Sequence, residues 1–155
     1  MLTKHLASLF ERDLQKLKTE ISSYSDETKL WITSAQISNS GGNLCLHLLG
    51  NLQYFIGGVL AASGYERNRP EEFSLKNIPV KDLIYSIEQT TVIISKTITR
   101  VTEEDLAKEY PEKVFAQTMT TEYFLLHLLA HLNYHLGQIN YHRRILDNYQ
   151  PRTGG

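Results

Sequence analysis

The stretch HLLAHLNYHLGQINYH, which runs from His127 to His142, decides both the fold class and the candidate chemistry of this chain. It holds four of the six histidines, spaced four, four and seven residues apart. On a helical wheel these histidines fall within an arc of about 80°, and the leucines and Ile139 fall in the neighbouring arc. The stretch therefore predicts a long helix whose histidines border the face that enters the core.

Four long segments of the chain carry the apolar spacing of α-helices. Asn39 or Ser40 is suited to cap the second segment, and Gly64 follows its end. The end of the third segment is rich in β-branched residues, but its unbroken three- and four-residue spacing favours helix. Four helices in a chain of this length predict an all-α four-helix bundle. The predicted helices span about 2–23, 41–63, 79–101 and 120–148.

The four helices are expected to form one domain over residues 1–150, followed by a short tail at 151–155. The turn-rich connection between the first two helices contains Trp31, which we expect to plug the core. Gly57 and Gly58 lie inside the second helix and cost about 1 kcal/mol each relative to alanine. Close approach of another helix would offset that cost.

Composition excludes several classes of partner. The net charge is −1, so the chain has no basic field that would attract nucleic acid. No apolar run approaches the ~20 residues of a membrane span, and the charged N-terminal stretch is not a signal peptide. Cys45 is the only cysteine, so an intramolecular disulfide is impossible and we expect Cys45 to be a core residue. We expect a cytoplasmic protein.

Helix geometry limits how the histidines can share one metal ion. His127 and His142 are separated by about 22 Å along the helix axis, so one ion cannot touch both. Two histidines one turn apart can bind the same ion. The spacing therefore leaves two candidate pairs, His127 with His131 and His131 with His135.

A third ligand must come from another helix, because zinc-type sites use three or four protein ligands. His5 lies at the fraying start of the first helix. His47 lies in the most apolar helix, with no acidic residue near it in sequence. A buried histidine is costly unless it is neutral and hydrogen-bonded or bound to a metal, so His47 is the natural third ligand. A hydrogen-bonded core histidine is the competing interpretation.

The absence of acidic residues excludes two metal-site classes. Residues 41–65 and 123–146 contain no Asp or Glu. Ferritin-like di-iron bundles need inward carboxylates on their helices, and hydrolases of the HExxH type need a glutamate base. A glutamate of the first or third helix, such as Glu11 or Glu88, is a candidate to hydrogen-bond a metal ligand without itself binding the metal.

Two motifs resemble those of DinB-like (damage-inducible) proteins. HLNYHLGQI at 131–139 is similar to the closing-helix signature of that family, in which HxxxH is followed by Gln. NLCLHLLGNLQYFIG at 43–57 is similar to its second-helix motif, in which one histidine enters the bundle. The resemblance covers nearly the whole chain. It implies an up-down-down-up bundle with a long crossover between helices 2 and 3 at 64–79, and often a homodimer.

The resemblance also implies a set of metal ligands. Gln138 of the signature selects between the two candidate pairs, and either holds a ligand or packs against a neighbouring helix. His127 and His142 have no ligand counterpart in the motif. The implied ion is usually nickel or zinc, although three neutral histidines also fit iron or copper. The implied ligands are His47, His131 and His135.

Some relatives with this resemblance are thiol S-transferases, which join a low-molecular-weight thiol such as bacillithiol, mycothiol or glutathione to an electrophile. Such chemistry needs no carboxylate base, because a metal-bound thiol loses its proton and the thiolate is the nucleophile. The alternative is a non-catalytic protein that binds metal or dimerises as a helical scaffold. Bis-histidine haem binding by His47 and one histidine of the last helix is a third hypothesis.

Overall fold

The computed structural model describes residues 2–33 and 36–147. The described chain is helical and contains no strand, apart from one isolated bridge between Glu109 and Thr120. The predicted all-α fold is therefore confirmed. The predicted tail at 151–155 lies outside the described residues. The long helices are α1 (Leu2–Ser22), α2 (Gly41–Leu52), which continues as η2 (Gln53–Leu60), α4 (Val80–Ile98) and α6 (Thr121–Asp147).

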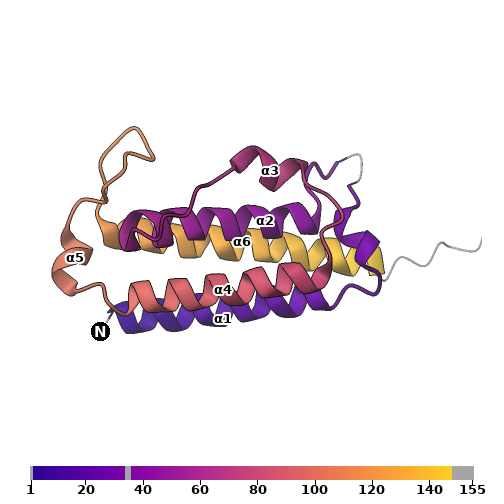
Figure 1. The fold of residues 1–155 in the computed structure, drawn as a ribbon, viewed down its shortest axis with the longest axis horizontal. Coiled ribbons are helices and arrows are strands. Elements are labelled where there is room, and N and C mark those ends of the chain that lie inside the picture. The colour runs from indigo at the N-terminus through magenta and orange to yellow at the C-terminus, as the bar shows by residue number, and fades with distance from the viewer. Residues whose placement is uncertain (1, 34–35, 148–155) are drawn as a thin grey trace, which may run out of the picture.

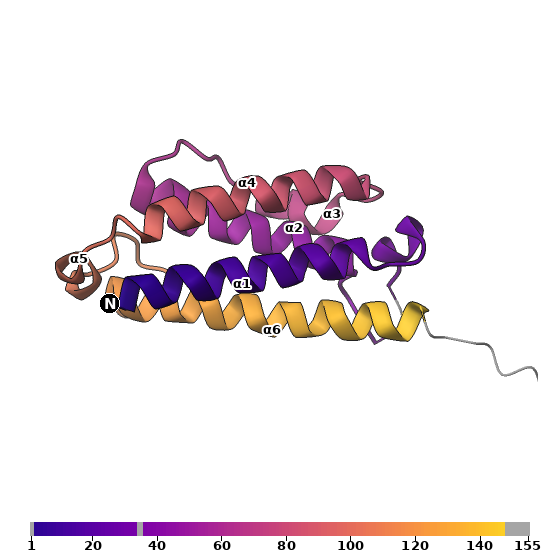
Figure 2. The same cartoon turned by 90° about the horizontal axis from the view of Figure 1, so that it is seen from below.

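The long helices lie side by side in an up-down-down-up arrangement. Helices α1 and α6 run in one direction, and α2 and α4 run in the opposite direction (Figure 1 and Figure 2). Helices α1 and α2 each pack against both α4 and α6. The chain returns from the end of η2 to the start of α4 by a long crossover that passes over α2 (Figure 1). The topology agrees with the prediction.

Local capping explains where the helices begin. Ser40 is the N-cap of α2, and its hydroxyl accepts a hydrogen bond from the Asn43 amide at 3.2 Å. Thr120 stands before α6 and accepts from the Tyr123 amide at 3.2 Å. Each hydroxyl satisfies an amide that has no partner inside the helix. Helix α5 (Glu103–Ala107) begins with a capping box at Thr102.

The core contains the residues that the helical spacing selected. Trp31, at the end of the short helix η1 (Glu27–Trp31), is buried as predicted. Its ring lies so close to Gly42 that a Cβ there would meet three ring atoms at 2.7–2.8 Å. The buried apolar stripe of α1 consists of Leu6, Phe10, Leu14, Leu17 and Ile21.

The second helix differs from the prediction in its pitch and its end. The α-helical pitch gives way to a π-helix at Gln53, and the helix ends at Leu60, three residues before the predicted boundary. Gly57 allows the predicted close approach, because a Cβ there would lie 3.1 Å from Ile93 Cγ2 of α4. Gly58 does not, since its nearest contacts would be ordinary ones at 3.7 Å.

The crossover is more ordered than the prediction of a polar connection implied. It contains a short helix, α3 (Arg69–Ser74), which packs against α2. Asn68 accepts from the Glu71 amide at 3.4 Å, and Pro70 occupies the first turn, where its missing amide costs nothing. A six-residue helix is too short to show periodicity, so the sequence pattern did not indicate it.

None of the helices in the described part of the chain is both long and apolar enough to serve as a membrane span.

Candidate metal centre

Three histidines from two helices meet at one point of the bundle. His47 projects from α2, and His131 and His135 project from successive turns of α6. The Nε2 atom of His131 lies 3.2 Å from Nε2 of His47 and 3.1 Å from Nε2 of His135. One nitrogen from each ring lies within 4.8 Å of the other two. The structure thus brings together the three residues that the motif resemblance implied.

The separations of these nitrogens suit a metal ion. Metal–nitrogen bonds of about 2.0–2.1 Å in tetrahedral geometry place the nitrogens about 3.3 Å apart. Two of the three rings are also held in the tautomer that metal binding requires. His47 Nδ1 lies 3.0 Å from a carboxylate oxygen of Glu72, and His135 Nδ1 lies 2.7 Å from Oε1 of Gln138. Because those oxygens accept, each Nδ1 carries the proton and each Nε2 presents a lone pair.

His131 completes the set from the middle of the cluster. Its Nδ1 is buried and has no hydrogen-bond partner among the described residues. Burial, and then the neighbouring His135 and His47, lower the pKa of His131 to about 4. Burial also lowers the pKa of His135, against the hydrogen bond that its Nδ1 donates to Gln138, which raises the pKa. Neutral rings are the form that binds a metal, so the site fits a divalent ion.

The exposure of the cluster and the distance between two of its nitrogens limit what it could bind. His131 and His135 are only half-buried, so solvent can reach the cluster. Three protein ligands with solvent access are typical of catalytic metal sites, which keep one position open. Nε2 atoms of His47 and His131 that meet at 3.2 Å leave no room for a porphyrin between them. Haem binding by this pair would therefore require the two rings to move apart.

Glu72 is the residue of this site that the sequence analysis missed. It lies on α3, is 6 % exposed and contacts the back of His47. Burial would raise the pKa of Glu72, but hydrogen bonds from Arg67 and His47 outweigh it and hold the pKa below its ordinary value. His47 therefore has an acidic partner, which the sequence did not place near it. Glu72 lies 25 residues further along the chain, in the polar crossover.

Glu11 and Glu88, the candidate hydrogen-bond partners of the histidines, make contacts elsewhere in the bundle. Glu11 accepts a hydrogen bond from the Ser95 hydroxyl, and Glu88 pairs with Lys18 at 2.6 Å. Both contacts join α1 to α4, on the side of the bundle away from α3 (Figure 1). The expectation that Glu11 or Glu88 reaches the site was therefore wrong.

The two flanking histidines have other surroundings. His127 stacks on Phe124, with ring centroids 5.8 Å apart, and meets Phe115 edge-on at 5.0 Å. His142 is buried, with Nδ1 2.7 Å from the Tyr24 hydroxyl and Nε2 2.8 Å from the Ile32 carbonyl oxygen. His142 thus joins the α1–α2 connection to α6. Neither histidine belongs to the three-residue cluster.

Cys45 has the surroundings of a core residue. Its side chain is fully buried, and burial raises the pKa of the thiol to about 12. A thiol in that state supplies no thiolate near neutral pH. Cys45 is also outside the cluster, and the prediction that it packs in the core is confirmed.

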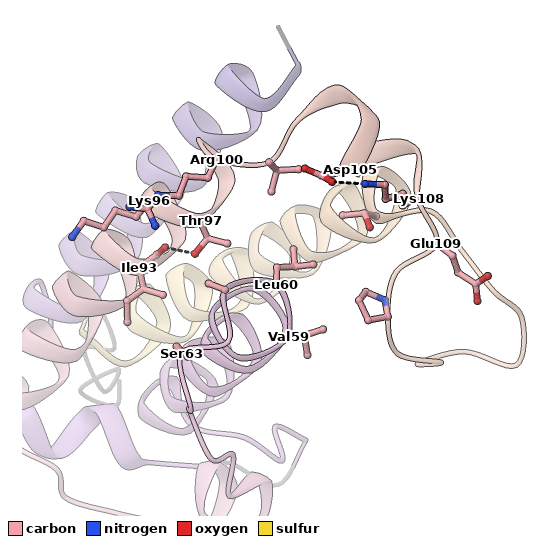
Figure 3. A pocket seen from close by; sticks show the side chains of 14 residues that line it. Val59, Leu60, Ser63, Ile93, Lys96, Thr97, Arg100, Asp105, Lys108 and Glu109 are labelled. Atoms are coloured by element: carbon pink, nitrogen blue, oxygen red, sulfur yellow. Dashed lines mark hydrogen bonds and ion pairs between the residues drawn. The ribbon is translucent and has the colours of Figure 1, made fainter.

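A separate cavity of about 690 Å³ lies where η2, α4 and α5 meet (Figure 3). Leu60 and Val59 form its apolar floor, and an ion pair between Asp105 and Lys108 lies across from them. Its lining includes neither the three histidines nor Glu72 or Gln138. The cavity is therefore distinct from the candidate metal centre.

Comparison with known proteins places the chain in a family. No curated protein matches the sequence. Residues 3–153 match the family described as "Protein of unknown function (DUF1572)". This match spans nearly the whole chain, including all four long helices and the crossover. The chain therefore belongs to the DUF1572 family.

Proposed function

We propose that this protein binds one divalent metal ion through Nε2 of His47, His131 and His135. The convergence of three Nε2 atoms, two of them with Nδ1 held by an acceptor on the far side, carries this proposal. Nickel and zinc are the first candidates, and iron and copper share the preference for imidazole. The DUF1572 family is DinB-like, which supports the same ligand set.

We further propose that the site activates a low-molecular-weight thiol for transfer to an electrophile. A metal ion bound here would supply a position at which a thiol loses its proton. The protein's part is to keep the ligands neutral and oriented, with Glu72 and Gln138 fixing two rings. Glu72 faces Nδ1 of His47 and not the Nε2 side, so it does not act as a base toward a thiol in that position. Loss of the thiol proton would therefore depend on the bound metal ion and not on Glu72.

A thiol panel tests this activity. The metal-loaded protein is incubated with several small thiols and a chromogenic electrophile, and the metal-free protein serves as the control. We expect metal-dependent turnover with at least one thiol, and loss of turnover in His135→Ala. If the loaded protein turns over none of them, the non-catalytic metal-binding scaffold replaces the transferase as the better hypothesis.

We also propose that a second copy of this chain packs against α6. The helix exposes seven uncharged residues at three- and four-residue steps, which form one stripe along its surface. Tyr134 at the centre of the stripe is 66 % exposed. From Tyr134 the steps are four, four and three residues toward the start of α6, and three, four and four residues toward its end. Antiparallel pairing of two α6 helices near Tyr134 would bring Ala130 close to Gly137 and Glu122 close to Arg144. The stripe consists of Tyr123, Leu126, Ala130, Tyr134, Gly137, Tyr141 and Ile145.

Sedimentation of Tyr134→Glu tests this pairing. A charge at the centre of the stripe would be buried without a partner in the dimer, so we expect the variant to be monomeric. Tyr85→Glu is the matched control, because Tyr85 is 63 % exposed on α4 and away from the stripe. A wild-type monomer, or a dimer that survives Tyr134→Glu, contradicts the proposed interface.

A further inference from the structure

We infer that Glu72 of the crossover is a positioning residue for the metal site, and that helix α2 is shaped to receive it. This inference rests on the metal-binding function proposed above. It assigns a role to the crossover, which otherwise only connects two helices. The role is to fix the proton of His47 on Nδ1, so that Nε2 is free to bind the metal.

The carboxylate of Glu72 is held from two sides. Oε1 lies 3.0 Å from His47 Nδ1. Arg67 donates from Nε to Oε2 and from Nη2 to Oε1, both at 2.8 Å. The three side chains are each no more than 12 % exposed. A fork of this kind fixes the plane of the carboxylate, and the carboxylate in turn fixes the imidazole.

Helix α2 provides the space for this carboxylate. Gly50 lies under it, and a Cβ at Gly50 would sit 2.0 Å from Oε2 and 2.7 Å from Cδ of Glu72. Any side chain at this position would displace the carboxylate. Gly50 follows His47 by three residues, so both face α3 from one side of α2.

Asn43 supplies the third contact from the same face of α2. Its side-chain amide donates to the carbonyl oxygens of Glu72 at 3.0 Å and Leu75 at 2.8 Å. These bonds satisfy backbone acceptors at the end of α3, which lack partners inside so short a helix. Asn43 therefore holds α3 by its backbone, Gly50 leaves room for the Glu72 carboxylate, and His47 receives that carboxylate.

Other parts of the crossover support the same ring. Phe73 of α3 packs on His47 with ring centroids 5.0 Å apart, and Arg69 lies over Phe73 at 5.3 Å. Glu71, which is next to Glu72, is exposed, and its carboxylate makes none of these contacts. Glu71 and Glu72 thus differ in contact but not in chemistry, which makes them a matched pair.

Competition of the protein with a chromogenic chelator for Zn²⁺ tests the role of Glu72. Loss of a partner behind a metal-binding histidine typically weakens affinity by about 10- to 100-fold, and we expect this for Glu72→Ala. Gly50→Ala should weaken binding in the same way, because it displaces the carboxylate without removing it. Glu72→Gln keeps an acceptor oxygen and should retain more affinity than Glu72→Ala. Glu71→Gln should bind as the wild type does.

A second readout separates positioning from general damage to the fold. Nitrogen-15 chemical shifts of His47 in the metal-free protein should report a proton on Nδ1 in the wild type and in Glu72→Gln. They should report a mixture of tautomers in Glu72→Ala. Wild-type affinity and an unchanged tautomer in both Glu72→Ala and Gly50→Ala overturn this inference alone. Failure of the wild type to bind any divalent ion overturns the proposed function as well.

Discussion

At the scale of single residues, the site depends on which ring nitrogen of each histidine carries the proton. His47 and His135 are both settled by a hydrogen bond at Nδ1. His131 has no such partner, and its Nδ1 is buried. A buried polar atom without a partner destabilises the folded chain, so the middle histidine is retained at a cost in stability. That cost is typical of a residue kept for function.

The titration of His131 gives a pH prediction for the metal-free protein. The pKa of His131 falls from 6.5 to about 4 on folding, mainly because of burial. Between these values the unfolded chain binds more protons at this position than the folded chain does. The free energy of unfolding should therefore fall as the pH drops through this window.

Denaturant unfolding in the presence of a chelator measures this effect. The midpoint of the wild type should decrease between pH 6.5 and pH 4, and His131→Asn should lose less over the same interval. The wild type and the variant are compared at each pH, so that other titrating groups cancel. An equal decrease of the midpoint in the two proteins would contradict the assignment of this pH dependence to His131.

At the scale of elements, helix α2 is set in place by glycines that admit large side chains. Gly42 receives the ring of Trp31, and Gly50 receives the carboxylate of Glu72. The two contacts lie on different faces of the helix. One fixes α2 against η1, and the other fixes it against α3. His47 lies between the two glycines in the sequence.

Gly42→Ala tests the contact with Trp31. The new Cβ would meet three ring atoms at 2.7–2.8 Å, closer than any ordinary contact. Overpacking of this kind costs about 1–3 kcal/mol, which should appear in the free energy of unfolding. Gly58→Ala is the control, since its Cβ meets nothing closer than 3.7 Å. That variant should stay within about 1 kcal/mol of the wild type. If Gly42→Ala leaves the free energy of unfolding unchanged, the indole of Trp31 is not fixed against Gly42.

At the scale of the whole molecule, the sequence predicts what periodicity and short-range chemistry control. The four long helices follow from apolar spacing, and Ser40 and Thr120 mark two helix starts by their hydroxyls. The wheel of the last helix limits the possible ligand pairs. The motif resemblance then selects His131 and His135, which the structure brings to His47.

The sequence does not predict features that depend on contacts between distant segments. The π-helix after Leu52 leaves no mark in the apolar spacing. Glu72 lies in a polar crossover, where nothing distinguishes it from the exposed Glu71 beside it. One signal was present in Gly50, a glycine inside a helix three residues after a candidate ligand. A glycine there indicates close approach by another group, but not which group approaches.

Metal titration of the purified protein tests the three-histidine site most directly. We expect the wild type to bind about one divalent ion per chain, because the three ligand atoms form a single cluster. Alanine at His47, His131 or His135 should abolish this binding, and His127→Ala and His142→Ala should retain it. Retention of wild-type stoichiometry and affinity by His47→Ala would contradict the proposed site.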